Sequence, residues 1–236
     1  TSSPPDNWID FRSLSFDLTE TAGNSISQAG FAAGTSGNVS FAFELLNLLM
    51  LQNGVNMVDS AGNPVFASSP FAGDAVSFYQ DFATNNGSWD EDLDNDSVKF
   101  LEGNLAMIAA PSWRYHDILY FNDRYDLGID ISVAPMPQVT GQQSRIDYAT
   151  YWGNVVALDR PNSTESWEFL NWLSQPEQLR KLRDNEALNR DYFGFLYPRV
   201  DMQQELLSDS FLRVYNNMLS TAQSWPMVNG LEVKQI

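Results

Sequence analysis

The sequence predicts an α/β fold, and three observations support that class. Segments with helical periodicity alternate along the chain with short apolar runs that end at Gly or Pro, as expected where helices and strands alternate. Hydrophobic residues make up 43% of the 236 residues, enough for a core in one large or two small domains. No apolar run approaches the ~18 residues of a membrane helix, and no internal repeat is visible.

The start of the chain predicts a linker, a loop and a helix. Residues 1–6 are rich in Ser and Pro and predict a linker, and the small, Gly-rich stretch 21–38 predicts a loop. Residues 39–53 predict a helix that Asn38 caps and Gly54 ends. The apolar face of this helix is expected to consist of Val39, Ala42, Phe43, Leu46 and Met50.

The next stretch predicts a turn, two helices and a strand. After a turn at 59–66, a second helix is expected to end at Gly87. The residues expected to share its apolar face are Ala75, Tyr79, Phe82 and Ala83. An acidic stretch then leads into a short helix around Phe100, and the apolar run 105–110 predicts a buried strand.

The second half predicts further alternation. A helix is expected from Ser112, followed by strands at 127–138 and 154–158. The remaining helices are expected to begin at Ser163 and Pro176, with a last one within 208–225.

Charge and composition exclude several classes of function. The net charge is −17, from 30 acidic and 13 basic residues, which argues against binding nucleic acid or an anionic membrane through a basic patch. There is no Cys, so disulfides and thiolate metal sites are excluded, and His116 is the only His. The opening residues lack the basic start and apolar core of a secretory signal.

No motif for a metal, a cofactor or a catalytic triad is complete. Four aspartates within 90–96 have the spacing of a calcium loop, but Asn95 and Leu101 stand where that loop needs Gly and Glu. A solvated lead-in to a helix is the favoured interpretation. His116 lacks an accompanying G-x-S-x-G nucleophile motif, and no Gly-rich phosphate loop is present. We therefore expect no metal and no cofactor, while a carboxylate pair for glycoside hydrolysis stays open.

Aromatic residues outside helical faces suggest a binding site. They lie at predicted strand and helix ends, mixed with Ser, Thr, Asn and Asp: Trp113, Tyr148, Tyr151, Trp152 and Trp225. Flat aromatic rings with neighbouring polar groups suit a sugar, which has an apolar C–H face and a hydroxyl rim. Core packing explains the same residues equally well at this stage, and it is favoured for Trp167 and Trp172.

Six segments, in order, resemble one known family. They are "GTSGNVSFAFELLNLLMLQNGVNMVDSAGNPVF", "FYQDFA", "FLEGNLAMIAAPSW", "VAPMPQ", "YWGNVVAL" and "SWEFLNWLSQPEQ". Together they are similar to the extracellular solute-binding proteins of ABC sugar importers, the maltose-binding-protein-like family. The F-x-x-G-x-x-A-M strand followed by a Trp is the most telling of these motifs.

The resemblance implies a periplasmic-binding-protein-like fold, in which two α/β lobes close on a carbohydrate without catalysis. It implies that Trp113 stacks on the sugar and that Asn38 and its Gly-rich loop line the cleft. The stretch "YATYWGN" is implied to lie at a hinge crossing beside the ligand. The residues implied to bind ligand are Asn38, Trp113, Tyr148, Tyr151, Trp152, Gly153 and Trp225.

The resemblance also implies how the chain divides. Residues 1–153 and 199–236 correspond to the C-terminal lobe, and 154–198 to a small part of the N-terminal lobe, whose main sheet is missing. The implied protein is extracellular or periplasmic, with lipid anchoring of the full-length protein as an option. Its implied partners are a sugar and a membrane permease, and it is a monomer or is completed by the missing lobe. The alternatives are a carbohydrate-active enzyme that uses a carboxylate pair, or a surface interaction module.

Overall fold

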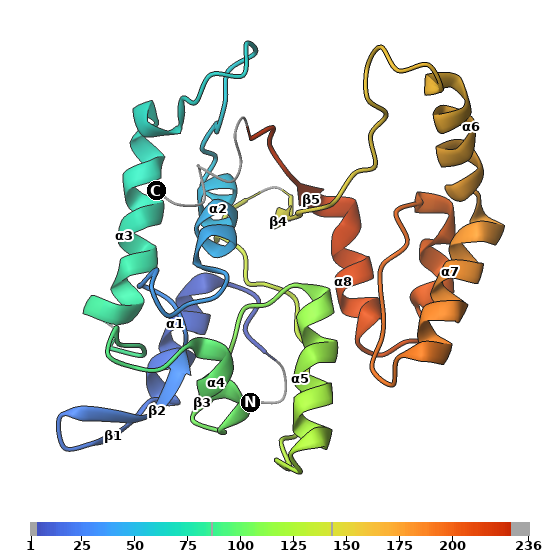
Figure 1. Cartoon of the computed structure of the whole chain (residues 1–236). Coiled ribbons are helices and arrows are strands. Elements are labelled where there is room, and N and C mark those ends of the chain that lie inside the picture. Colours follow the sequence, from blue (N-terminus) through green and yellow to red (C-terminus); the bar gives the residue numbers. More distant parts are fainter. Residues whose placement is uncertain (1–3, 86, 143, 228–236) are drawn as a thin grey trace.

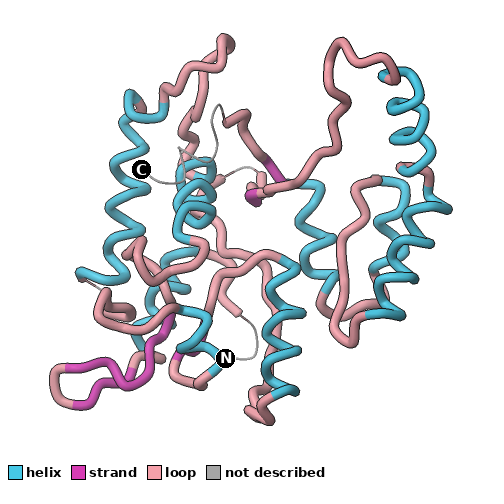
Figure 2. Tube along the Cα trace, in the orientation of Figure 1, coloured by secondary structure: helices cyan, strands magenta, loops and turns pink. Residues whose placement is uncertain are grey.

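The computed structural model describes residues 4–85, 87–142 and 144–227. They form a helix-rich α/β molecule with two small sheets. Figure 1 shows α1 to α5 and the first sheet on one side, α6, α7 and α8 on the other, and β4 and β5 between them. Long loops connect the two sides, as the tube in Figure 2 shows.

The elements follow the chain with short strands and longer helices. The first half contains α1 (Trp8–Asp17), β1 (Glu20–Ala22), β2 (Ser25–Phe31), α2 (Ala42–Gln52), the 3-10 turn η1 (Phe66–Ser68), α3 (Pro70–Thr84), α4 (Asp96–Leu101), β3 (Leu105–Met107) and α5 (Ser112–Arg124). The second half contains β4 (Asp147–Tyr148), α6 (Ser163–Leu173), α7 (Pro176–Asn189), η2 (Val200–Leu206), α8 (Leu212–Met218), η3 (Leu219–Thr221) and β5 (Ala222–Gln223).

The first sheet has the order β1-β2-β3. β1 and β2 form an antiparallel hairpin, and β2 pairs in parallel with β3, with Ala29 opposite Leu105 and Phe31 opposite Met107. The parallel pairing needs a crossover, which α2, α3 and α4 supply. The alternation of helices and strands read from the sequence is therefore confirmed in this half of the molecule.

Half of the stretch 21–38, predicted as a loop, lies in the strands β1 and β2. Its small residues allow α1 to pack closely on β2, because a Cβ at Gly30 would lie only 1.7 Å from the carbonyl oxygen of Ser15. Glycine is needed here to make room for the neighbouring backbone, and the hairpin turn 23–24 and residues 32–38 form the loops of the stretch.

The main core lies between α2, α3 and the first sheet. The buried side chains of α2 include Leu45, Leu48 and Leu49, and α3 contributes Ala75, Tyr79 and Phe82. The predicted apolar face of α3 is thus confirmed for those three residues. Of the predicted face of α2, Met50 is buried in the main core, Ala42 and Leu46 are partly buried against it, and Val39 is buried just before the helix in a second cluster. The prediction missed Leu45, Leu48 and Leu49, because the helix begins three residues later than expected.

The start and end of α2 differ in how well the sequence predicted them. Phe41 occupies the N-cap and Asn38 lies in the loop before it, so the predicted Asn38 cap is wrong. Gly54 follows the helix with φ +80°, a conformation that favours glycine, which confirms the predicted end.

Three predicted elements in the rest of the chain are absent or shortened. Residues 127–138 and 154–158 form no strand in the described chain, and the helix expected within 208–225 is confined to α8. A strand forms only where a neighbouring strand completes its backbone hydrogen bonds. These two segments have no such neighbour among the described residues, although Gln138 bridges to Asn7.

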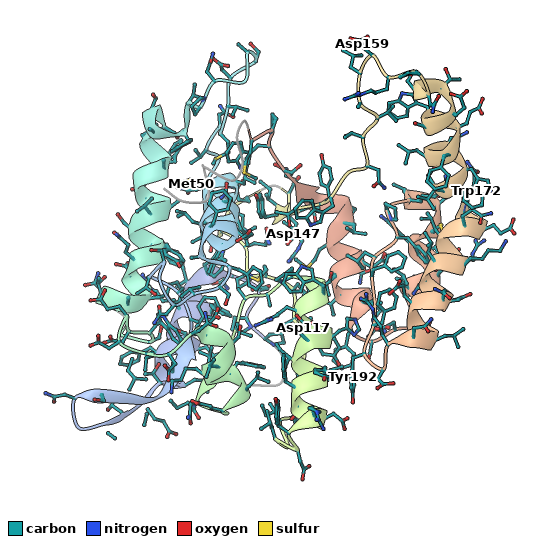
Figure 3. The ribbon with its side chains drawn as sticks, viewed as in Figure 1. Met50, Asp117, Asp147, Asp159, Trp172 and Tyr192 are labelled. Carbon is teal, nitrogen blue, oxygen red and sulfur yellow. The ribbon has the colours of Figure 1, made fainter. Side chains whose placement is uncertain are left out.

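Asp147 of β4 forms an ion pair with Arg145 and a hydrogen bond with the C-terminal segment. Asp147 is 1% exposed, accepts a 2.8 Å hydrogen bond from Arg145 and a 2.7 Å hydrogen bond from the hydroxyl of Thr221. β4 and β5 pair in parallel beside it. Figure 3 shows Asp147 in the middle of the molecule, where this pairing holds residues 221–223 against the first region.

Candidate functional site

One side of α2 gathers three of the predicted ligand-binding residues. Phe41, Glu44 and Asn47 are spaced three residues apart, which places them on neighbouring turns of one side of the helix. We call them the α2 stripe. Each member has a predicted site residue beside it, and those residues come from distant parts of the chain.

Trp113 lies beside the first member of the stripe. It is the second residue of α5, just beyond the carboxyl end of β3, where Pro111 turns the chain into the helix. Its ring meets that of Phe41 edge to face, with centroids 5.6 Å apart and planes at 74°. About half of the Trp113 side chain, 52%, remains exposed. The sequence thus places a large aromatic where open α/β sheets bind ligands.

Tyr148 lies near the second member. It is half-buried on β4 and packs against the main core. Its hydroxyl is buried and has no hydrogen-bond partner in the described chain. Burial, together with the nearby carboxylate of Glu44, raises the pKa of Tyr148 to about 12. The phenol is therefore neutral at physiological pH and keeps a proton to donate.

Trp225 is hydrogen-bonded to the third member. Its indole Nε1–H donates to Oδ1 of Asn47 over 2.7 Å, and Asn47 is itself buried and donates to the carbonyl of Phe43 over 2.8 Å. The β4–β5 pairing brings the C-terminal segment to this position. Trp225 is partly buried against the main core, so its role in packing is evident.

Tyr151, Trp152 and Gly153 follow β4 as an exposed segment. The side chains of Tyr151 and Trp152 are 79% and 102% exposed, and neither makes a ring contact or hydrogen bond in the described part of the chain. The structure therefore leaves these rings in solvent and does not bring them onto the α2 stripe.

Asn38 lines a separate cavity of about 500 Å³. The cavity is formed by the loop Gly34 to Asn38 with Glu91 and Asp92. The amide nitrogen of Asn38 donates to the carbonyls of Asp90 and Leu93, both at 2.9 Å. Its amide oxygen accepts from Trp89 over 3.0 Å and from Thr35. The polar atoms of Asn38 thus hold the acidic loop in place.

Two further expectations concern the tryptophans of α6 and possible metal ligands. Trp167 and Trp172 were expected to pack in a core, but they are 58% and 51% exposed. No residue of α6 is buried. Figure 3 shows Trp172 in the α6–α7 part, away from the α2 stripe. Within the residues that the structure describes, no three His, Asp or Glu side chains gather closely enough to hold a metal ion.

Sequence reasoning missed all three members of the α2 stripe. The helix was predicted, but Phe43 was assigned to its apolar face, and Glu44 and Asn47 received no role. A signal was present, since two polar residues three apart interrupt the run "FELLNLL". Without the positions of residues 113, 148 and 225, that spacing alone indicates only an amphipathic helix.

Solved structures share this fold over nearly the whole chain. An ABC transporter solute-binding protein from Thermotoga lettingae TMO, bound with alpha-D-tagatose, has a TM-score of 0.68 at 17% identity. That match covers 94% of this chain and 55% of the other. A Thermus thermophilus maltotriose binding protein bound with maltotriose has a TM-score of 0.60 at 18% identity, covering 98% and 58%. A cyclo/maltodextrin-binding protein complexed with maltotetraose has a TM-score of 0.68 at 14% identity, covering 99% and 57%.

The fold is that of periplasmic-type solute-binding proteins, as the sequence predicted. A family model described as bacterial extracellular solute-binding protein matches residues 3–184, and the chain belongs to this family. The chain spans a little over half the length of the solved structures above. A comparison with curated protein sequences gives no match. No helix in the described residues is long and apolar enough to cross a membrane.

Proposed function

We propose that the chain captures a sugar or oligosaccharide as the substrate-binding component of an ABC importer, without catalysing a reaction. The observation that carries the proposal is the alignment of Trp113, Tyr148 and Trp225 along the α2 stripe. Flat rings beside a carboxylate, an amide and an unpartnered hydroxyl suit the C–H faces and hydroxyl groups of a sugar.

The family and the fold support this proposal. The family consists of extracellular solute-binding proteins. Structures of the same fold carry alpha-D-tagatose, maltotriose and maltotetraose, according to their descriptions. The ligand would lie between two lobes, with Tyr151, Trp152 and Gly153 approaching it from the hinge side and Asn38 lining the cleft wall through its loop.

The lobe assignment belongs to the same proposal. Residues 1–153 and 199–236 would form the C-terminal lobe, and 154–198 part of the N-terminal lobe. The large exposed apolar side chains of the latter segment support this division, because they need a neighbouring layer to cover them. Closure of the lobes on the ligand would create the form that a membrane permease recognises. The protein would act as a monomer outside the cytoplasmic membrane, with a lipid anchor in its full-length form.

Tryptophan fluorescence tests the proposal. Titration with glucose, galactose, maltotriose and mannobiose should give a saturable change with at least one sugar, since Trp113 and Trp225 flank the site. Trp113→Ala should weaken that binding at least tenfold, because stacking of the sugar ring on the flat indole is lost. Trp172→Ala is the matched control, since Trp172 is equally exposed on α6. No response to any sugar would contradict the proposed function.

A further inference from the structure

A second hollow lies on the side of α2 opposite the α2 stripe. It has a volume of about 330 Å³ and is formed by residues of α1, α2 and α3 together with Val139 and Thr140 of the loop after α5. Leu49, which lines it, follows the central stripe residue Glu44 by five positions, or about 140° around the helix. We call this hollow the α1–α3 groove. It is separate from the aromatic residues of the proposed sugar site.

The floor of the groove is apolar and belongs to the main core. Trp8, Leu49 and Ala75 form it, and none of them is more than 4% exposed. The indole of Trp8 donates to Oε1 of Gln52 over 2.6 Å, and Gln52 in turn donates to two backbone carbonyls. Packing and hydrogen bonds therefore fix the shape of the groove before any partner arrives.

Large apolar side chains form the edges of the groove. On α1, Ile9 lines it and is 63% exposed. On α3, the ring of Phe78 lines it and meets the ring of Trp8 with centroids 5.9 Å apart. Phe71 lies seven residues before Phe78 on the same side of α3 and is 51% exposed. Exposed apolar side chains around a preformed hollow indicate a contact site for another protein.

Carboxylates without a basic partner surround the same groove. Asp74 lines it and lies on α3 between Phe71 and Phe78. Asp6 precedes α1, and Asp10 lies in the first turn of that helix. None of these three aspartates forms an ion pair with another described residue. Such a rim attracts Lys and Arg side chains and repels acidic ones.

The described basic side chains do not cancel this charge. Arg12 lies over the ring of Phe78, and its guanidinium pairs with Asp81 over 3.2 Å. Three other basic residues of the first region pair with neighbouring carboxylates, and Arg124 ends α5, which does not line the groove: the pairs are Lys99 with Glu102, Arg114 with Asp117, and Arg145 with Asp147. The basic residues of 154–227 belong to the α6–α8 part, which Figure 1 shows on the other side of the molecule.

We propose that the α1–α3 groove docks a basic amphipathic helix of a partner protein. The apolar face of that helix would place its side chains, spaced three and four residues apart, between Ile9 and the two phenylalanines of α3. Lys or Arg residues beside that face would meet Asp74 and the carboxylates at the start of α1. An anionic membrane surface, or a second copy of this strongly acidic chain, does not fit such a rim.

Two designed peptides test the proposal. Both are 18-residue helices with Leu on one face, and the other face is Lys in one peptide and Glu in the other. The chain has no Cys, so Thr140→Cys provides a single labelling site at the groove for an environment-sensitive dye. The Leu/Lys peptide should give a saturable shift of the dye at position 140, and no shift of the same dye attached through Glu20→Cys on β1. The Leu/Glu peptide should bind at least tenfold more weakly at low ionic strength.

Variants of the unlabelled chain assign the binding to the groove, measured by the anisotropy of a dye on the peptide. Ile9→Ser combined with Phe71→Ser should weaken binding of the Leu/Lys peptide at least tenfold. Both side chains are exposed, so the circular dichroism spectrum should stay that of the parent. Val98→Ser combined with Val200→Ser is the matched control, because these apolar side chains are exposed on α4 and η2. Asp74→Asn should weaken binding about threefold at low salt, the scale of an exposed ion pair.

Three results would overturn the proposal. Absence of a dye shift at position 140, or equal affinity of the parent and the Ile9→Ser/Phe71→Ser variant, would show that the groove does not dock the helix. Equal affinity for the Leu/Lys and Leu/Glu peptides would show that the partner need not be basic. A molecular mass in light scattering that grows with protein concentration in the parent, but not in the same double variant, would assign the groove to a second copy of the chain.

Discussion

Residues 4–148 and 154–189 bury their apolar side chains to very different extents. The first region contains two buried clusters built from α1, α2, α3 and the first sheet. In the second region, Leu179 is the only buried residue among those described. Its exposed large apolar side chains are Val155, Leu158, Trp167, Phe169, Trp172, Leu182 and Leu188. Both regions therefore contain helices, but only residues 4–148 form a hydrophobic core of their own.

The two regions also differ in charge. Residues 4–148 carry 19 acidic and five basic side chains, whereas 154–189 carry six and four. A strongly acidic surface repels other acidic surfaces and favours solvation. A nearly neutral, apolar surface is suited to burial against another layer of protein. Charge and burial thus give the same contrast. The first region buries its own core and has an acidic surface, whereas the second has an apolar, nearly neutral surface suited to contact with another layer of protein.

The largest expected difference between the regions is the response to loss of a tryptophan. Trp89 is 1% exposed and donates hydrogen bonds to Thr35 and Asn38. Trp89→Ala should lower the free energy of unfolding by about 3–5 kcal/mol, through lost burial and the cavity left behind. Trp172→Ala should change it by less than about 0.5 kcal/mol, because that ring is half exposed. Urea denaturation compares the two, and similar losses would contradict the contrast.

The next largest effect is expected at buried Asp147, which pairs with Arg145 and accepts a hydrogen bond from Thr221 of the C-terminal segment. Asp147→Ala should lower the free energy of unfolding by about 3 kcal/mol, because Arg145 and Thr221 lose their buried partner. In the second region, Glu177 pairs with Lys181, and both side chains are largely exposed. Glu177→Ala should give no resolvable change in the urea midpoint. A midpoint for Asp147→Ala that equals the parent value would show that the contacts of Asp147 do not hold the C-terminal segment in place.

The contrast explains which parts of the molecule the sequence could predict. The face of α3 and the glycine that ends α2 follow from local spacing and turn chemistry, and both were predicted correctly. The run 154–158 has the composition of a buried strand, yet Val155 and Leu158 are 86% and 88% exposed. An apolar composition indicates that a segment tends to be buried, but the segment forms a buried strand only where a partner strand is present.

The candidate site shows a similar division. The aromatic residues at 113, 148 and 225 could be selected as candidates because they follow strands or helices, and the structure brings these three to α2. The α2 stripe itself could not be predicted, since Asn47 and Trp225 are separated by 178 residues. Pairing over that distance depends on the tertiary fold, including the parallel contact of β4 with β5.

The smallest expected effect concerns the seam between the first region and residues 191–212. His116 on α5 lies at this seam, where a Cβ on Gly194 would be 2.4 Å from its Nε2 atom. Nearby, the rings of Tyr115 and Phe211 stack with centroids 4.1 Å apart. The Nε2 atom is buried and has no hydrogen-bond partner among the described residues. Burial lowers the pKa of His116, although Asp209 and Asp117 partly oppose this shift.

The direction of the pH effect follows from that lowered pKa. Below about pH 6.5 the unfolded chain protonates its histidine, while the folded chain still holds His116 neutral. The unfolded state then binds more protons, so the free energy of unfolding should fall as the pH drops from 7.5 to 5.5. His116→Gln cannot titrate, so its free energy of unfolding should fall less over the same range in urea titrations. Because the seam joins the first region to residues 191–212, the near-ultraviolet signal of Tyr115 and the neighbouring aromatic rings should weaken with acid in the parent and change less in the variant. Identical pH profiles for the two proteins would show that the seam does not respond to protonation of His116.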